Sequence, residues 1–137
     1  MSQENVDKTR DYIDAYNRRD FDAAVRDFDP HVQWVLPEHQ GFDSAVGPEQ
    51  IRKFWEGLDE TMAELRLDAQ EFVDAGDQVA VRLRYFGRGR ESGLELDTEM
   101  YHQVTTFRDG TMVRIEYFTT WAEALEAAGV EGSGPAA

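Results

Sequence analysis

The stretch from residue 94 to residue 120 constrains the fold more than any other part of this chain of 137 residues. Two runs rich in β-forming residues, Leu94–Phe107 and Thr111–Thr120, flank Asp109-Gly110, a pair that is typical of a tight hairpin turn. A strand as long as the first run has to curl, because strands in sheets twist. A curled sheet has a hollow face, and we predict that this hollow is a small-molecule pocket.

The rest of the chain alternates between helical and strand-like patterns. Apolar residues spaced three and four apart predict helices over residues 4–18, 21–28 and 48–62. A capping box at Thr120-Trp121-Ala122-Glu123 predicts the start of a last helix, which Gly129 ends. Alternating β-formers predict strands over 31–36, 63–73 and 79–86, and loops are expected at 38–46 and 87–93.

This order of elements predicts an α+β fold. We expect three helices from the N-terminal half to pack on a curved, cone-shaped sheet that is antiparallel or mixed, followed by a short C-terminal helix. One domain is expected over residues 1–130, because 137 residues are too few for two. Residues 131–137, rich in Gly, Pro and Ala, are expected to form a frayed tail.

Charge and composition exclude several classes of function. The net charge is −14, from 28 acidic and 14 basic residues spread along the chain, and such a field repels nucleic acids and anionic membranes. Without cysteine there are no disulfides, thiolate metal sites or cysteine nucleophiles. No apolar run approaches the roughly 20 residues of a membrane span. The polar N-terminus is unlike a signal peptide, so we expect a cytoplasmic protein.

Aromatic residues are numerous for a domain of this size, at 12% of the chain. Most must pack in the core, but Tyr and Trp also line cavities, because their OH and NH groups need polar partners when buried. Trp34 and Trp55 are the residues we expect first in a pocket wall. His31, His39 and His102 show no metal-binding spacing, and we expect neither a metal ion nor another cofactor.

Several segments resemble one known family. They are residues 12–23 (YIDAYNRRDFDA), 47–51 (GPEQI), 107–110 (FRDG), 113–118 (VRIEYF) and 122–129 (AEALEAAG). Together they are similar to SnoaL-like polyketide cyclases of the nuclear-transport-factor-2-like superfamily, which also contains steroid delta-isomerases and limonene epoxide hydrolases. The resemblance covers about residues 4–130 and implies the cone-shaped fold, which hosts unrelated chemistries.

Only part of the steroid-isomerase site has matching residues in this chain. Tyr12 matches the helical tyrosine of that family, whereas the position of the general base falls near Leu36 and that of the protonated acid falls at Gln103. Both carboxylates are therefore missing, although Gln103 can still donate a hydrogen bond. If Gln103 points inward, His102 points to the outer face of the sheet, where it is expected at the surface or in a dimer interface.

Comparison with the epoxide hydrolases and cyclases singles out Glu116. It matches one acid position, and Arg82 or Arg84 can supply the arginine, but the second acid near that arginine is absent. Glu116 is therefore either a proton-transfer group in the pocket or one half of a cross-strand pair with an arginine. His39, in the loop before the third helix, either gates the pocket mouth or is solvated.

Two functions follow from these residues. The first is an enzyme that acts on a small hydrophobic molecule by acid–base isomerisation, cyclisation or hydrolysis, and the second is a non-catalytic ligand-binding or dimerisation module. In both, a homodimer through the outer face of the sheet is expected. The expected catalytic residues are Glu116 and Tyr12, and the expected substrate-binding residues are Tyr16, Trp34, Trp55, Tyr101 and Gln103.

Overall fold

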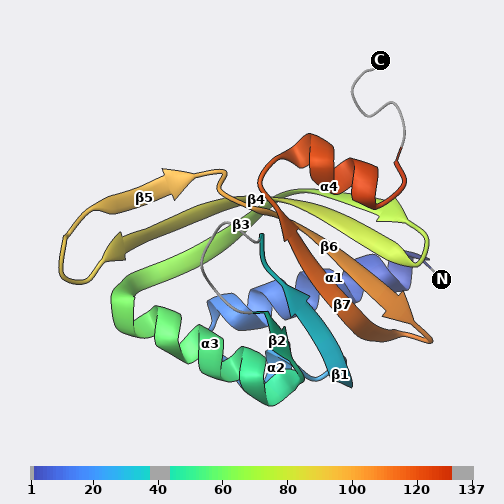
Figure 1. Cartoon of the computed structure of the whole chain (residues 1–137), viewed down its shortest axis with the longest axis horizontal. Helices are drawn as coiled ribbons and strands as arrows, with labels where there is room; N and C mark the ends of the chain where they lie inside the picture. The colour runs from blue at the N-terminus through green and yellow to red at the C-terminus, as the bar shows by residue number, and fades with distance from the viewer. Residues whose placement is uncertain (1, 38–43, 131–137) are drawn as a thin grey trace.

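The computed structural model describes residues 2–37 and 44–130, and the predicted α+β architecture is confirmed (Figure 1). The helices in these ranges are α1 (Ser2–Asn17), α2 (Phe21–Ala24), α3 (Pro48–Thr61) and α4 (Trp121–Ala127). The strands are β1 (Phe28–Val35), β2 (Ala45–Val46), β3 (Met62–Ala75), β4 (Gln78–Gly89), β5 (Glu95–Thr98), β6 (His102–Arg108) and β7 (Thr111–Phe118). No described helix combines the length and the apolar character that a membrane crossing requires.

All the described strands join one curved sheet. Its order is β2-β1-β7-β6-β4-β3, and β5 pairs with β4 beside this path. β1 and β7 run parallel, while the other pairs are antiparallel, so the sheet is mixed. Figure 1 shows α1, α2 and α3 on one side of the sheet and α4 on the other. Two buried clusters follow from this arrangement, a large one on the side of α1 and a smaller one beneath α4.

The hairpin predicted around Asp109-Gly110 is confirmed as the β6–β7 pair. Both turn residues have positive φ angles, 54° and 78°, which is the geometry that Asp-Gly favours in two-residue hairpins. The single long strand predicted over residues 94–107 is wrong, because residues 99–101 separate β5 from β6. Strand β4 is long enough to pair with both segments, with β6 through Gln78–Val81 and with β5 through Tyr85–Arg88. The chain is not a strand between these two pairings.

Other boundaries also shift. β4 continues to Gly89, so part of the predicted 87–93 loop is strand. The second helix is only four residues long, with Asp20 accepting a hydrogen bond from Ala23 N, and β1 already begins at Phe28. Within the predicted 38–46 loop, Ala45 and Val46 form β2, whereas residues 38–43, His39 among them, lie outside the described residues. One half of the predicted capping box is present, because Thr120 Oγ1 accepts from Glu123 N at 3.1 Å, whereas Glu123 Oε1 accepts from Thr119 Oγ1 at 3.1 Å.

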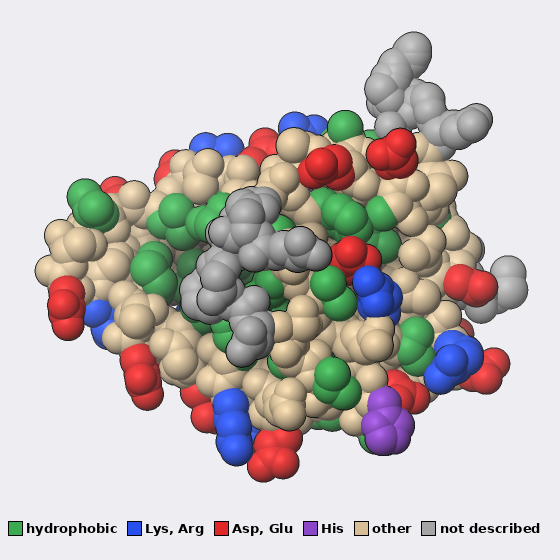
Figure 2. Space-filling model, viewed as in Figure 1, with side chains coloured by type: hydrophobic (Ala, Val, Ile, Leu, Met, Phe, Trp, Pro, Cys, Tyr) green, Lys and Arg blue, Asp and Glu red, His purple; other side chains and the backbone are tan. Residues whose placement is uncertain are grey.

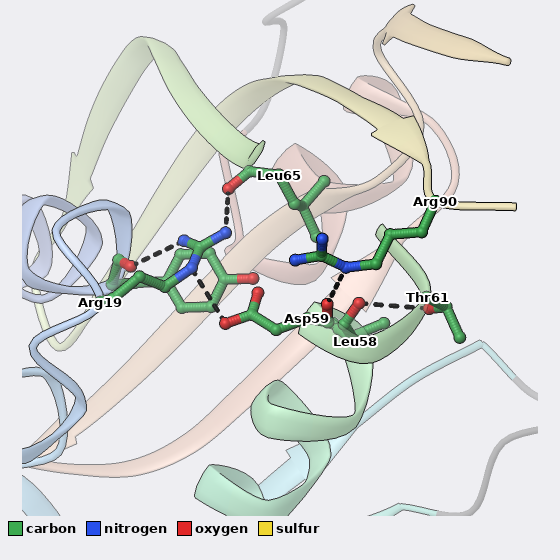
Figure 3. Close-up of polar contacts among 7 residues, drawn as sticks. Arg19, Leu58, Asp59, Thr61, Leu65 and Arg90 are labelled. Atoms are coloured by element: carbon green, nitrogen blue, oxygen red, sulfur yellow. Dashed lines mark hydrogen bonds and ion pairs between the residues drawn. The ribbon is translucent and has the colours of Figure 1, made fainter. Parts of the chain in front are cut away.

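Side chains from the end of α1 cover the outer edge of β3. The Asn17 amide donates to Leu67 O at 2.8 Å and accepts from Leu67 N at 2.9 Å, as a neighbouring strand would. Arg19 donates to Leu65 O at 2.7 Å and pairs with Asp59 of α3 at 3.1 Å (Figure 3). Arg90 donates to Asp59 O at 2.6 Å, so the ends of α1, α3 and β4 are held around the start of β3.

His102 faces away from Gln103, as strand alternation predicted, but it is not a surface residue. α4 packs on this side of the sheet, and the His102 side chain is only 3% exposed, with its ring 5.6 Å from that of Trp121. Its Nδ1 accepts a hydrogen bond from Leu83 N at 3.2 Å, and its Nε2 lies 3.7 Å from Glu99 Oε1. The expected location at the surface or in a dimer interface is therefore wrong, because a helix of the same chain occupies that face.

Acidification is expected to destabilise the protein through His102. Burial lowers its pKa below the ordinary 6.5, the Glu99 carboxylate raises it, and the Arg82 guanidinium lowers it, with burial dominating. The unfolded chain therefore binds a proton at His102 more readily than the folded protein does. The contribution of His102 to the free energy of unfolding is complete above about pH 6.5 and is lost as the pH falls below that value. Between pH 7.5 and 5.5 the free energy of unfolding should fall by up to about 1.4 kcal/mol from this residue.

Urea denaturation at both pH values tests this expectation in the original protein and in His102→Asn. The asparagine keeps an acceptor for Leu83 N but cannot be protonated in this range. The variant should therefore lose less stability on acidification than the original protein. The same loss in both proteins would contradict the assignment to His102.

Candidate functional site

A pocket of about 210 Å³ lies between the inner face of the sheet and helices α1 and α3. None of the described side chains that line it carries a charge at neutral pH. They are Tyr12, Tyr16, Trp34, Leu36, Phe54, Trp55, Leu58, Met62, Leu65, Leu67, Tyr85, Leu96, Met100, Tyr101 and Tyr117. Figure 2 shows hydrophobic side chains gathered on the face of the molecule that carries β5 and α3.

Trp55 of α3 is the centre of the aromatic wall. Its ring is only 2% exposed, and the ring centroids of Tyr16 and Trp34 lie 5.2 and 5.7 Å from it in edge-to-face contacts. Tyr12, Phe21 and Phe28 complete the group at 5.2–6.3 Å. Rings that hold one another at these distances form a rigid surface. The wall is therefore formed before any ligand enters.

A polar cluster stands behind one part of this wall. Gln103 is fully buried, and its Nε2 donates to Tyr117 Oη at 2.8 Å and to Tyr12 Oη at 3.2 Å. The two tyrosine oxygens lie 3.3 Å apart and share a hydrogen bond. Thr105 Oγ1 donates to Gln103 Oε1 at 3.2 Å. Helix α1 and strands β6 and β7 meet at this cluster.

The phenols of the pocket stay protonated at neutral pH. Burial raises the pKa of Tyr16 to about 12, and it raises the pKa of Tyr12, Tyr85 and Tyr117 well above the ordinary 10.0. Burial also raises the pKa of Tyr101. A neutral phenol donates one hydrogen bond and accepts others, so the site can orient a polar group but carries no anion to remove a proton.

The structure brings most of the predicted substrate-binding residues together. Tyr16, Trp34, Trp55 and Tyr101 line the pocket, and so does Tyr12, which the sequence predicts as a catalytic residue. Gln103 does not line it but holds the hydroxyls of Tyr12 and Tyr117 from behind. Sequence reasoning missed Tyr117 and Tyr85 as lining residues. The alternation Val79, Val81, Leu83, Tyr85, all buried, was a signal for Tyr85.

Glu116 is not part of the pocket. It follows Ile115 and precedes Tyr117, both buried, and therefore lies on the opposite face of β7. There its Oε1 accepts from Arg114 Nε and Nη2 at 3.2 and 3.1 Å, and its side chain is 31% exposed. The predicted location of Glu116 in the pocket is therefore wrong. Its partner Arg114 lies on the same strand, so the predicted cross-strand pair with Arg82 or Arg84 is wrong as well.

Arg82 and Arg84, the predicted arginine partners of Glu116, form ion pairs on a different part of the outer face. Arg82 pairs with Glu99 at 2.9 Å and Arg84 with Asp97 at 2.6 Å. Arg88 pairs with Glu64 at 3.1 Å farther along the same strand. In the described part of the chain, no three His, Asp or Glu side chains lie close enough together to hold a metal ion.

Comparison with known proteins identifies the family. The family model of the SnoaL-like domain matches residues 9–115. The chain belongs to the SnoaL-like domain family. No curated protein sequence matches this SnoaL-like protein.

Solved structures share its fold at low sequence identity. An NTF2-like protein of unknown function from Burkholderia pseudomallei is 22% identical, with a TM-score of 0.78 over 90% of this chain and 95% of its own. TerC, co-crystallised with polyporic acid, is 22% identical, with a TM-score of 0.77 over 92% of this chain and 98% of its own. A putative polyketide cyclase from Sinorhizobium meliloti is 22% identical, with a TM-score of 0.66 over 86% and 99%.

Proposed function

We propose that this SnoaL-like protein binds a small, uncharged and largely apolar molecule in its aromatic pocket. The observation that carries the proposal is the lining itself: aromatic, Leu and Met side chains surround about 210 Å³, and no described lining residue is charged. Pockets for drug-sized ligands measure roughly 300–1,000 Å³, so a smaller ring system fits this one best. TerC, co-crystallised with polyporic acid, and the putative polyketide cyclase support a small organic ligand by likeness of fold.

Electrostatics support a neutral ligand. A carboxylate in this pocket would lose its hydration and meet no lysine or arginine among the described lining residues. The net charge of −14 opposes the approach of an anion as well. Binding of an anion should therefore be much weaker than binding of a neutral molecule of the same shape.

Catalysis in the same pocket is the second candidate. Hydroxyls that donate, such as those of Tyr12 and Tyr117, can stabilise negative charge on a carbonyl oxygen during isomerisation, cyclisation or hydrolysis. However, the described lining residues include no carboxylate, histidine or lysine that could act as a base. Binding without a reaction is therefore the function that the geometry supports best.

The homodimer and the cytoplasmic location stay predictions. The apolar outer face at Ala80 and Val104 is already buried beneath α4 of the same chain. A dimer through the outer face would therefore have to use the parts that α4 leaves uncovered, which carry ion pairs such as Arg84–Asp97 on β4 and β5 and Arg114–Glu116 on β7.

The test compares two naphthalenes of similar size by isothermal calorimetry and protein NMR. 2-Ethylnaphthalene should bind about a hundred-fold more tightly than 2-naphthoate, because the carboxylate would be buried without a partner. Leu96→Trp should block binding of 2-ethylnaphthalene, since Leu96 lines the pocket. Leu94→Trp is the matched control, because Leu94 lies just before the same strand and is 74% exposed. Equal binding of the two naphthalenes, or no binding of either, would refute the proposal.

A further inference from the structure

We propose that His102 is a positioning residue for the aromatic pocket, although it lies on the other face of the sheet. Its uncharged imidazole ring holds the segment that carries Met100 and Tyr101, and protonation of the ring releases this segment and weakens ligand binding. Because it concerns the same pocket, this inference rests on the proposed function. It follows from the geometry of residues 99–102, at the junction of β5 and β6.

Residues 99–102 form a bulge in the sheet. β4 pairs with β6 as far as the pair Val81–Gln103, and it pairs with β5 from the pair Tyr85–Thr98 onward. Between these two pairs β4 has three residues, whereas the opposite segment has four. One extra residue on one strand is what defines a β-bulge, and bulges often redirect side chains beside functional sites.

The bulge places two consecutive side chains on the inner face of the sheet. Met100 and Tyr101 both line the pocket, whereas strict alternation along a strand would allow only one of them to do so. The Tyr101 ring packs edge-on against the Tyr85 ring, with the two centroids 6.1 Å apart. The shape of this part of the pocket wall therefore depends on how the bulge is held.

Both ends of the bulge are held from the outer face. Glu99 Oε1 accepts from Arg82 Nε at 2.9 Å. His102 Nδ1 accepts from Leu83 N at 3.2 Å, so the ring takes the place of the backbone carbonyl that a continuous neighbouring strand would offer. Residues 99–101 belong to no strand, which makes these side-chain contacts important for their position.

Only an uncharged His102 can accept from Leu83. A protonated imidazole carries a hydrogen on both nitrogens, so Nδ1 can no longer be an acceptor. The positive ring would also attract the Glu99 carboxylate, whose Oε1 lies 3.7 Å from Nε2 and is paired with Arg82. Both ends of the bulge would then move, and the two lining side chains with them.

The surroundings of the ring favour its uncharged form. Burial has the largest effect and lowers the pKa of His102. The Glu99 carboxylate raises this pKa, and the Arg82 guanidinium lowers it. α4 faces the ring with Trp121, and β7 places Phe118 opposite His102; neither of these side chains titrates. At neutral pH the bulge is therefore held in place.

NMR titration of the histidines with and without 2-ethylnaphthalene tests the coupling, because this ligand has no titratable group. If the ligand prefers the protein with uncharged His102, binding must lower the pKa of that residue by the same factor. A fall of about 0.5 pH unit is expected, which corresponds to about a three-fold change in affinity. His31, exposed on β1, is the internal control and should titrate identically with and without the ligand.

A matched pair of variants tests the bond to Leu83 separately. Asn and Leu have side chains of the same shape, but only Asn has an acceptor where His102 has Nδ1. By calorimetry, His102→Asn should bind 2-ethylnaphthalene as the original protein does at pH 7.5 and should keep this affinity at pH 5.5. His102→Leu should bind about three-fold more weakly at both pH values. The original protein should approach His102→Leu only at pH 5.5.

An unchanged or raised pKa of His102 in the ligand complex, or equal binding by the two variants, would overturn this inference and leave the proposed function standing. A purely structural role for His102 would lower stability on acidification but would leave its titration unaffected by the ligand. If the unaltered protein bound no ligand at either pH, the proposed function would be refuted and this inference with it. If His102→Leu does not fold, the NMR titration of the unaltered protein still decides the question.

Discussion

Replacing Trp55 with alanine is expected to lower the free energy of unfolding by about 3–5 kcal/mol. The side chain is 2% exposed and packs against Tyr12, Tyr16 and Trp34, so its removal leaves a cavity that the surrounding rings cannot fill. Since domains of this size are stable by only about 5–15 kcal/mol, this single change should remove a large share of the stability. Ligand binding should be lost with it, because Trp55 is part of the pocket wall.

Urea denaturation followed by circular dichroism at 222 nm measures the loss without depending on tryptophan fluorescence. Trp121→Ala is the matched control, because Trp121 is half-buried on α4 and lies outside this ring cluster. Its cost should be about 1–2 kcal/mol. Equal losses for the two variants would show that the ring cluster around Trp55 is not the main support of the fold.

Replacing Gln103 with glutamate is expected to destabilise the protein by about 3 kcal/mol at pH 8 and by much less at pH 5. The side chain is fully buried, so burial should raise the pKa of a carboxyl group there above its unfolded value. The folded state then holds the proton more tightly than the unfolded chain does. Stability is therefore greatest below the unfolded pKa and is lost as the pH rises toward the folded pKa.

Urea midpoints of the variant and the original protein at pH 5 and pH 8 test this, with differences taken at the same pH so that other titrating groups cancel. Gln50→Glu is the control, since Gln50 is exposed on α3 and a carboxylate keeps the oxygen that accepts from Val46 N, so stability should change by less than about 0.5 kcal/mol at either pH. A constant difference between Gln103→Glu and the original protein would mean that the Tyr12 and Tyr117 hydroxyls fully stabilise the carboxylate. The expected pH dependence would then be wrong.

Local patterns predicted the elements of this fold well. The φ angles of Asp109 and Gly110, the Thr120 cap and the apolar face of α3 all depend on residues within one or two turns of each other. Such signals can be read from the chain because the interacting groups are neighbours in sequence. The break between β5 and β6 is different, since it depends on how far β4 extends beside them.

The candidate site was only partly predictable. Alternation along β7 already requires that Glu116 and Tyr117 point to opposite faces, so at most one of them can line the pocket. Which face is the inner one depends on the packing of α1 and α3, and the inner residue is Tyr117 rather than the predicted Glu116. The burial of His102 likewise depends on α4, which lies 19 or more residues later in the chain and folds back over β6.

The sequence by itself determined the family, the kinds and order of most elements, and an aromatic, acidic chain without cysteine. Tertiary structure alone decided which side chains meet: Tyr12 and Tyr117 are 105 positions apart, yet their hydroxyls share one hydrogen bond and Gln103. The physical reason is that periodicity and capping act over a few residues, whereas a pocket forms from the faces that distant elements present to one another. Those faces follow from sheet register and helix packing, which involve the whole chain at once.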